Sequence, residues 1–186
     1  MVAQPRQTTM SVQEYLTQER TSPVKHEYVE GHVYAMAGGT LAHDIVANNV
    51  RAILRNHLRG RPCRLLGPDV ILRVSAEVYY YPDALVVCED TLDLTTREVQ
   101  TARLVVEVLS DSTEAHDRGT KFKSYQTLPG CQEYLLIDGR RRGVERFHRG
   151  EQHLWVYQHY TSGETITLDT VGLTCPIADF YEDAGM

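Results

Sequence analysis

The chain has 186 residues, 42% of them apolar, which is enough for one domain with a substantial core and too few for two comfortable ones. Its 19 basic and 25 acidic side chains give a formal charge of −6, which argues against nucleic-acid binding through overall positive charge but allows a local basic groove. No stretch approaches the ~20 apolar residues that span a bilayer, and the N-terminus lacks the apolar core of a signal peptide. We therefore expect a cytoplasmic protein without a membrane partner.

The first ten residues predict a flexible lead-in, and residues 11–186 a single domain. Ser11 and Glu14 have the spacing of a capping box, which predicts a short helix through about residue 19. Residues 26–36 then alternate in polarity around Glu30-Gly31, which predicts a β-hairpin.

A helical pattern follows over residues 41–58, where apolar side chains recur at steps of three and four. Three arginines, each four residues apart, line another face of this helix and are candidates for contact with nucleic-acid phosphates: Arg51, Arg55 and Arg59. A second candidate stripe is formed by residues 140–142 with Arg146. Arginines on exposed helices are most often only solvated, which is the alternative for both stripes.

The rest of the chain alternates between strand and helix signals. Strands are predicted over residues 64–74, 78–88, 103–109 and 133–138, and a helix capped by Asp111 or Ser112 runs through about residue 128. Residues 143–174 predict a β meander, and residues 176–182 a short helical tail. From residue 41 the order is α-β-β-β-α-β, which indicates an α/β fold with a mixed central sheet flanked by helices.

The four cysteines are Cys63, Cys88, Cys131 and Cys175. They lie far apart and form no C-x-x-C pair, so the spacing indicates neither a zinc site nor a disulfide framework. We expect reduced thiols, as is usual for a cytosolic protein.

Two acidic residues lie in runs that otherwise predict buried strands. Asp83 is followed by Ala-Leu-Val-Val-Cys, and Glu107 lies within Leu-Val-Val-Glu-Val-Leu. An ionised carboxylate in an apolar strand is costly unless it is paired, hydrogen-bonded or bound to a metal. On neighbouring strands the two carboxylates can converge beside the Val108 carbonyl, and such oxygen ligands suit Mg²⁺. The alternative is a pair of capping or ion-paired carboxylates at strand ends.

Several linked motifs resemble one family over roughly residues 11 to 182. They are Pro82-Asp83, the run Val106-Glu107-Val108-Leu109-Ser110-Asp111-Ser112-Thr113, Asp117-Arg118-Gly119-Thr120-Lys121, and Glu133-Tyr134-Leu135-Leu136-Ile137-Asp138. The N-terminal run from His26 to Gly31, with Met36-Ala37-Gly38 and His43, also matches. The chain thus resembles the Uma-two family of restriction endonuclease-like proteins, in the PD-(D/E)XK nuclease superfamily. The α-β-β-β-α-β order is also the core of that superfamily.

The resemblance implies that Asp83 and Glu107 are catalytic carboxylates that bind Mg²⁺, or Mn²⁺, with the Val108 backbone carbonyl. The superfamily lysine normally follows the second acid at a position that Leu109 holds here, and an apolar side chain cannot polarise a water. In this family the matching lysine lies on the following helix, at Lys121, from which a long flexible ammonium can reach back to the strands. Lys123 is the rival, although it faces away from Lys121 on a regular helix.

Three further residues are weaker candidates. His43 matches a family histidine and is a candidate metal or substrate contact, although a histidine at a helix end is more often structural. Asp69 precedes a predicted strand and either adds a carboxylate or serves as a turn residue. Superfamily members often use an acidic residue from the N-terminal part, but Glu30 lies at the hairpin turn.

These observations predict a Mg²⁺-dependent endonuclease that hydrolyses DNA phosphodiester bonds. Two copies in a homodimer would cut two strands. The alternative is a catalytically inactive nuclease-fold protein that binds nucleic acid or a partner, which Leu109 and the acidic net charge favour slightly. Hydrolysis of a substrate other than nucleic acid is compatible with the same ligands but has no positive support.

Overall fold

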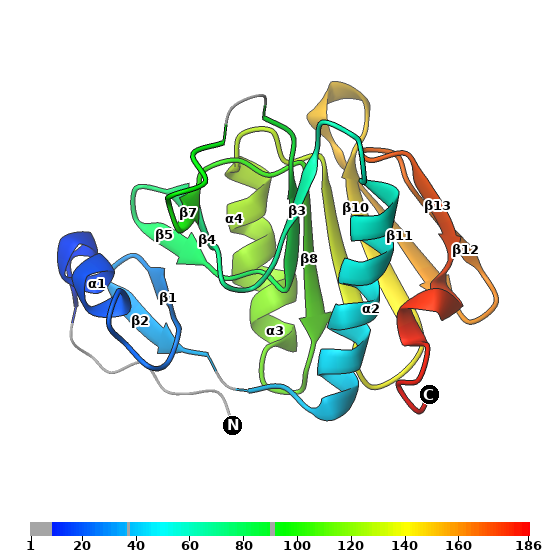
Figure 1. Cartoon of the computed structure of the whole chain (residues 1–186), viewed down its shortest axis with the longest axis horizontal. Coiled ribbons are helices and arrows are strands. Elements are labelled where there is room, and N and C mark those ends of the chain that lie inside the picture. The colour runs from blue at the N-terminus through cyan, green and yellow to red at the C-terminus, as the bar shows by residue number, and fades with distance from the viewer. Residues whose placement is uncertain (1–8, 37, 90–91) are drawn as a thin grey trace.

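A six-stranded mixed sheet forms the centre of the computed structural model, which describes residues 9–36, 38–89 and 92–186 (Figure 1). Its strand order is β11-β10-β9-β8-β6-β3, and only β8 and β9 are paired in parallel. The strands are β3 (Arg64–Leu66), β6 (Ala84–Val87), β8 (Leu104–Leu109), β9 (Glu133–Asp138), β10 (Gly143–Arg149) and β11 (Trp155–Thr161). This mixed sheet and its flanking helices confirm the predicted α/β, restriction endonuclease-like architecture.

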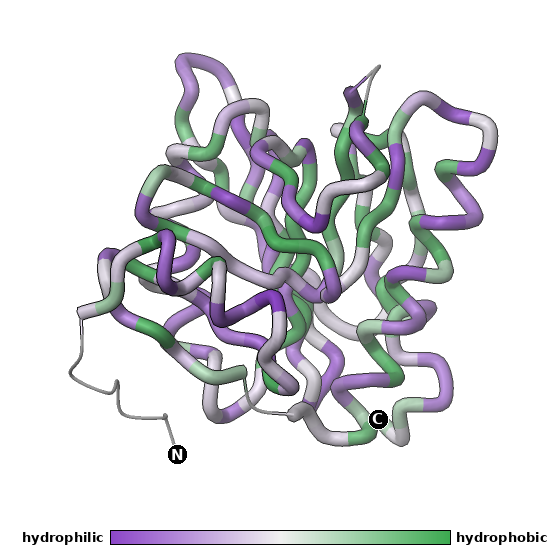
Figure 2. The backbone as a smooth tube through the Cα atoms, turned by 60° about the vertical axis from the view of Figure 1, so that its left-hand side comes forward, coloured by the Kyte–Doolittle hydropathy of each residue, from purple (hydrophilic) through white to green (hydrophobic). Residues whose placement is uncertain are grey.

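Helices cover both faces of this sheet. On one face, α2 (Leu41–His57) begins after Thr40, whose hydroxyl oxygen accepts the backbone N–H of His43. Figure 2 shows the colour alternating along α2, while the apolar stretches follow the central strands. The apolar stripe of α2 packs against the even-numbered residues of β8: Val46, Val50, Leu54, Leu104, Val106 and Val108. The odd-numbered residues of β8 face α4 (Phe122–Thr127) on the other side.

The helix predicted after β8 consists of three consecutive pieces. It starts with α3 (Glu114–His116) after Thr113, continues as one π-helical turn, η1 (Asp117–Lys121), and ends as α4 before Pro129-Gly130. The predicted cap at Asp111 or Ser112 is therefore wrong by one or two residues. π-Turns are rare and occur frequently at functional sites.

A second, five-stranded sheet lies beside the first, with the order β2-β1-β5-β4-β7. Its elements are β1 (His26–Val29), β2 (His32–Ala35), β4 (Ile71–Ser75), β5 (Val78–Tyr80) and β7 (Glu98–Val99), with α1 (Val12–Glu19) packed against β1. The predicted strands 64–74 and 78–88 are each divided between the two sheets. The first breaks at the turn in which Val70 donates to the Gly67 carbonyl, and the second breaks at Pro82, which has no N–H for a ladder.

The predicted capping box and β-hairpin near the N-terminus are confirmed. Ser11 and Glu14 form the capping box of α1, with each side chain accepting the backbone N–H of the other residue. The hairpin turns at Glu30 and Gly31, which both have positive φ, as a tight turn between strands requires. Of the predicted flexible lead-in, residues 1–8 lie outside the described residues, and Met10 donates its N–H to the Gly31 carbonyl.

The predicted C-terminal meander is shared between two sheets. The first hairpin, β10–β11, extends the central sheet, whereas β12 (Thr165–Leu168) and β13 (Leu173–Pro176) pair only with each other. Two 3₁₀ turns, η2 (Glu151–His153) and η3 (Ile177–Tyr181), complete this part. Among the described helices, none is long and apolar enough to cross a membrane.

The prediction of four reduced cysteines is wrong for one pair, because Cys63 and Cys88 form a disulfide. Arg64 of β3 pairs with Val87 of β6, so the two cysteines are the next partners along the same antiparallel ladder. This neighbourhood arises from strand register, which the spacing of the cysteines in the sequence does not reveal. Cys131 and Cys175 are free and buried.

Replacing Leu135 with alanine will lower the free energy of unfolding by about 2–5 kcal/mol, because this fully buried β9 side chain leaves a cavity between the sheet and α2. The measurement is denaturant unfolding followed by circular dichroism. Leu41→Ala is the control, since Leu41 is 86% exposed and its loss should change stability by less than about 0.5 kcal/mol. Equal effects of the two substitutions would contradict the assignment of this core.

Unfolded without a reductant, the chain will offer two thiols to a thiol-specific dye, those of Cys131 and Cys175. After reduction the same assay will count all four cysteines. Four reactive thiols before reduction would show that the Cys63–Cys88 bond is absent.

Candidate functional site

Asp83 and Glu107 lie opposite each other on neighbouring antiparallel strands. Ala84 of β6 pairs with Val106 of β8, and one step further along this ladder Asp83 meets Glu107. The Asp83 carboxylate accepts the backbone N–H of Val108 through Oδ2 at 2.7 Å, which holds it against β8. Directly opposite residues have Cβ atoms about 4.5–5.5 Å apart on one face of the sheet. Strand register thus brings the two predicted carboxylates together.

The Glu107 carboxylate is buried and is held by two donors from the helix that follows β8. Its Oε1 accepts from Lys121 Nζ at 3.0 Å and from the Tyr125 hydroxyl at 2.8 Å. Burial raises the pKa of Glu107 well above its usual range; the Lys121 charge opposes this rise, and neighbouring carboxylates, including Asp83, add to it. Burial likewise raises the pKa of Asp83, against the opposing charge of His43 and the hydrogen bond from Val108.

The Lys121 side chain extends from η1 into the protein and is only 5% exposed. Its Nζ lies 2.8 Å from Glu27 Oε1, 3.0 Å from Glu107 Oε1 and 3.4 Å from Asp117 Oδ1. Burial acts to lower the pKa of Lys121, but these three carboxylates outweigh it and raise the pKa well above its usual range. Lys121 is therefore a charged ammonium. Lys123 is exposed, so of the two rival lysines only Lys121 contacts the cluster.

Glu27 belongs to this cluster and is absent from the predicted site. It comes from β1 of the five-stranded sheet, is buried, and contacts Lys121 through Oε1 and His116 Nε2, at 3.7 Å, through Oε2. Hairpin alternation places Glu27 and Tyr28 on opposite faces, yet both are buried because β1 lies between β2 and β5 under α1. Glu27 is the N-terminal acidic residue that contacts Lys121, whereas Glu30 lies at the turn. The only signal in the sequence is an acid within the apolar run of the hairpin.

His43, at the start of α2, reaches the same edge of the sheet. Its Nε2–H donates to the Val108 carbonyl at 3.0 Å and lies 3.6 Å from Asp83 Oδ2. A side chain at Gly39 would place its Cβ 2.7 Å from the imidazole Nδ1, so the close approach of the loop requires glycine. The Val108 carbonyl, predicted as a metal ligand, is therefore already engaged by His43.

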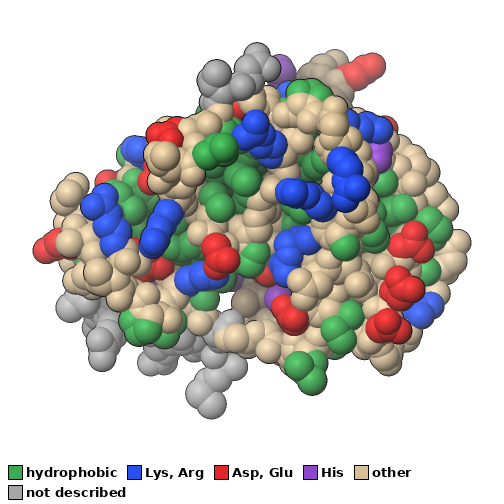
Figure 3. Space-filling model, in the orientation of Figure 1, with side chains coloured by type: hydrophobic (Ala, Val, Ile, Leu, Met, Phe, Trp, Pro, Cys, Tyr) green, Lys and Arg blue, Asp and Glu red, His purple; other side chains and the backbone are tan. Residues whose placement is uncertain are grey.

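Asp69 does not join the cluster, because its side chain is 87% exposed and pairs with Lys25. Of the first arginine stripe, Arg51 donates to the Asp83 backbone carbonyl at 3.1 Å, and Arg55 and Arg59 are exposed. Figure 3 shows Lys and Arg side chains gathered across the middle of one face, which is hollowed beside the N-terminal end of α2.

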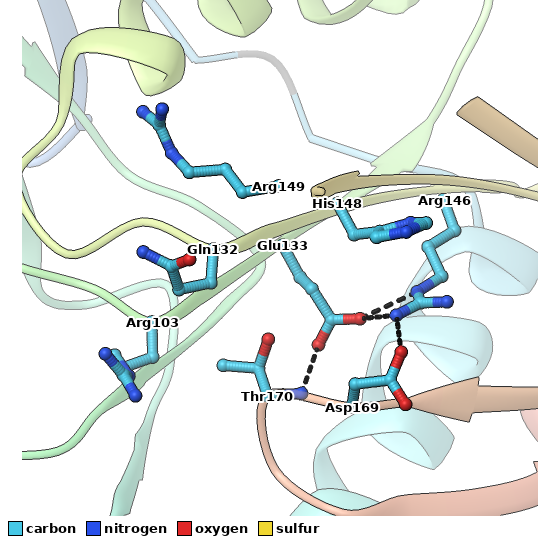
Figure 4. A pocket seen from close by; sticks show the side chains of 8 residues that line it. All are labelled: Arg103, Gln132, Glu133, Arg146, His148, Arg149, Asp169 and Thr170. Carbon is cyan, nitrogen blue, oxygen red and sulfur yellow. Dashed lines mark hydrogen bonds and ion pairs between the residues drawn. The ribbon is translucent and has the colours of Figure 1, made fainter. Parts of the chain in front are cut away.

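The second predicted arginine stripe is occupied by contacts within the protein. Arg146 is buried and pairs with Glu133 and Asp169, while Glu133 also accepts the Thr170 N–H (Figure 4). Residues 140–142 each donate to a carboxylate or carbonyl oxygen of the chain. Arg146, Glu133, Asp169 and Thr170 line a separate pocket of about 250 Å³ at the start of β9, whereas residues 140–142 follow the other end of this strand. Of this stripe, Arg146 is thus engaged within the protein, whereas Arg141 is 80% exposed, and its contact with phosphates stays a prediction.

The donor set at the cluster fits a hard divalent cation. Within the described ranges, Asp83 Oδ1 and Glu107 Oε2 accept no hydrogen bond, so each carboxylate keeps one oxygen for a ligand. Three carboxylates surround one ammonium here and Asp83 lies near Glu107, and the excess negative charge favours Mg²⁺. In the part of the chain that the structure describes, no three acidic, His or Cys side chains are already arranged to hold an ion, so Asp83 and Glu107 would share it with water.

Comparison with known proteins gives the family. Residues 12–178 match the Uma2 family model, described as "Putative restriction endonuclease". The chain is 34% identical to the Synechocystis protein slr1290, over 92% of this chain and 91% of that protein. It is 31% identical to sll1609 of the same organism, over 79% and 85% of the two chains. The fold is similar, with a TM-score of 0.78 and 14% identity, to the crystal structure of "a putative nuclease belonging to DUF820" from Anabaena variabilis, covering 93% of this chain and 98% of that one. The chain belongs to the Uma2 family of restriction endonuclease-like proteins.

Proposed function

We propose that the protein is a Mg²⁺-dependent endonuclease that hydrolyses DNA phosphodiester bonds, with Mn²⁺ as an alternative ion. The observation that carries this proposal is the position of Asp83, just before β6, opposite Glu107 of β8, with an ammonium 3.0 Å from Glu107. A site that only binds DNA has no need of two buried carboxylates, because they cost folding free energy and repel the phosphates of the DNA backbone. The family and the nuclease-like fold support the same class of reaction.

Asp83 and Glu107 would hold the metal through Asp83 Oδ1 and Glu107 Oε2. A bound Mg²⁺ supplies an acidified water and stabilises negative charge on a phosphate oxygen. The Tyr125 hydroxyl and Lys121 both donate to Glu107 Oε1, which would leave Oε2 of this carboxylate for the metal. The Val108 N–H holds Asp83 Oδ2 by a hydrogen bond, and His43 Nε2 lies 3.6 Å from the same oxygen.

Lys121 would orient the attacking water and stabilise the charge that develops on the phosphate. Its raised pKa keeps it protonated at neutral pH, so it is suited to electrostatic stabilisation and not to removing a proton from the water. In-line attack on phosphorus would leave a 5′-phosphate without a covalent enzyme intermediate. The exposed Arg55 and Arg59 on α2, and the basic face in Figure 3, are the surface on which the DNA backbone would lie.

Glu107→Ala and Lys121→Ala will each lower the rate of supercoiled plasmid cleavage in Mg²⁺ or Mn²⁺ by at least about 100-fold, because each removes a charge from the reacting centre. The measurement is conversion of supercoiled to nicked and linear plasmid. Lys123→Ala is the matched control, since this exposed lysine lies two residues away and makes no contact with the cluster; it should keep the native rate.

Cleavage that neither substitution affects would remove this site from consideration. If the native chain cuts nothing with either ion yet binds DNA, the inactive binding module is the better description.

Mg²⁺ will raise the melting temperature of the protein, and the rise will grow with pH from about pH 4 upward. The pKa values of Glu107 and Asp83 are raised in the folded state, so without metal the unfolded chain releases these protons first and stability falls as pH rises through this window. Metal binding requires the deprotonated carboxylates and offsets that loss. Thermal unfolding with and without Mg²⁺ measures the effect.

The control for this experiment is Asp69→Asn, which removes an exposed carboxylate and should leave the Mg²⁺ effect unchanged. Glu107→Gln should abolish it. A stabilisation by Mg²⁺ that shrinks as the pH rises would contradict the assigned ligands.

A further inference from the structure

The Lys121 ammonium has the surroundings of a bound metal ion. Its three nearest carboxylate oxygens come from three different elements: Glu27 on β1, Glu107 on β8 and Asp117 on η1. The Tyr80 ring covers the group at 5.4 Å from its centroid, and the amine is buried. A single positive charge is thus surrounded by oxygen ligands that would suit a divalent cation.

Asp117 supplies an independent observation. This residue is 2% exposed, and within the described residues its Oδ1 is buried without a hydrogen-bond donor. The oxygen lies 3.4 Å from Lys121 Nζ, which is the longest of the three distances. A buried carboxylate oxygen left in this state is costly, and a cation with a shorter bonding distance would satisfy it better.

The distances explain why the carboxylates do not form a metal site while Lys121 is present. They lie 2.8–3.4 Å from the nitrogen, whereas Mg²⁺ binds oxygen at about 2.0–2.1 Å and Ca²⁺ at about 2.3–2.6 Å. To bind an ion placed at Nζ, each oxygen would have to move inward by about 0.7–1.4 Å for Mg²⁺ and by about 0.2–1.1 Å for Ca²⁺. The ammonium both holds these groups in place and keeps them apart.

We propose that the Lys121 ammonium fills a second divalent-cation position, formed by Glu27, Glu107 and Asp117 beside the Asp83–Glu107 position. The native site then takes one ion, and removal of the ammonium opens a second site for an oxygen-preferring divalent cation. The count of one ion in the native chain rests on the proposed metal site at Asp83 and Glu107, whereas the position at Lys121 rests on neither that site nor nuclease activity. Lys121 thereby sets the number of metal ions in the site.

The test counts Mn²⁺ ions bound by the full chain, from the electron paramagnetic resonance signal of free Mn²⁺ during titration. The native protein should bind one ion and Lys121→Ala two. Lys121→Met should bind one, because the apolar methionine side chain fills the space that the alanine variant leaves empty. The exposed-lysine control, Lys123→Ala, should also bind one.

A folded Lys121→Ala variant that binds no more Mn²⁺ than the native chain would overturn the proposal. So would a second ion that persists when Asp117→Asn is added to Lys121→Ala. If Lys121→Ala is unfolded without metal, circular dichroism should show Mn²⁺-dependent folding, and its absence counts against the proposal.

The titration also separates this inference from the proposed function. A native chain that binds no ion, together with a Lys121→Ala variant that binds one and loses it with Asp117→Asn, would remove the Asp83–Glu107 metal site. It would leave the position at Lys121 in place.

Discussion

The structure depends on the burial of one ammonium among carboxylates. Lys121 joins β1 of the five-stranded sheet, β8 of the six-stranded sheet and the helix between β8 and β9. Charges this deep are tolerated only when they are paired, and removing one partner of such a group typically costs about 3–5 kcal/mol. The contacts that would support catalysis therefore also hold the two sheets together.

Much of the fold could be predicted from the sequence, because local patterns agree with the tertiary structure. The stripe of α2 and the apolar runs of β8 and β9 have the periods of the elements that they form. The division of residues 78–88 between two sheets was not predicted, since both parts are apolar and only Pro82 marks the change. The Cys63–Cys88 disulfide was not predicted for a related reason, because it depends on which strands become neighbours.

The candidate site could also be predicted in part from the sequence. Asp83 and Glu107 stand out as charges in apolar strand runs, Lys121 follows from the family resemblance, and the structure brings the three together. Glu27 was missed because its burial comes from α1 and β5, which pack around β1 from elsewhere in the chain. Asp69 was left open between an added carboxylate and a turn residue, and its side chain lies in solvent, paired with Lys25.

Because Glu27 enters from a different sheet than Asp83 and Glu107, the site lies on the boundary between two structural layers. Because a buried charge that loses its partner is costly, replacing one acid or the lysine alone would destabilise the protein even where the proposed chemistry is not needed. Selection for stability and selection for activity therefore act in the same direction on these side chains. In a lineage released from the need for activity, the cluster would persist, and its presence alone is no record of use.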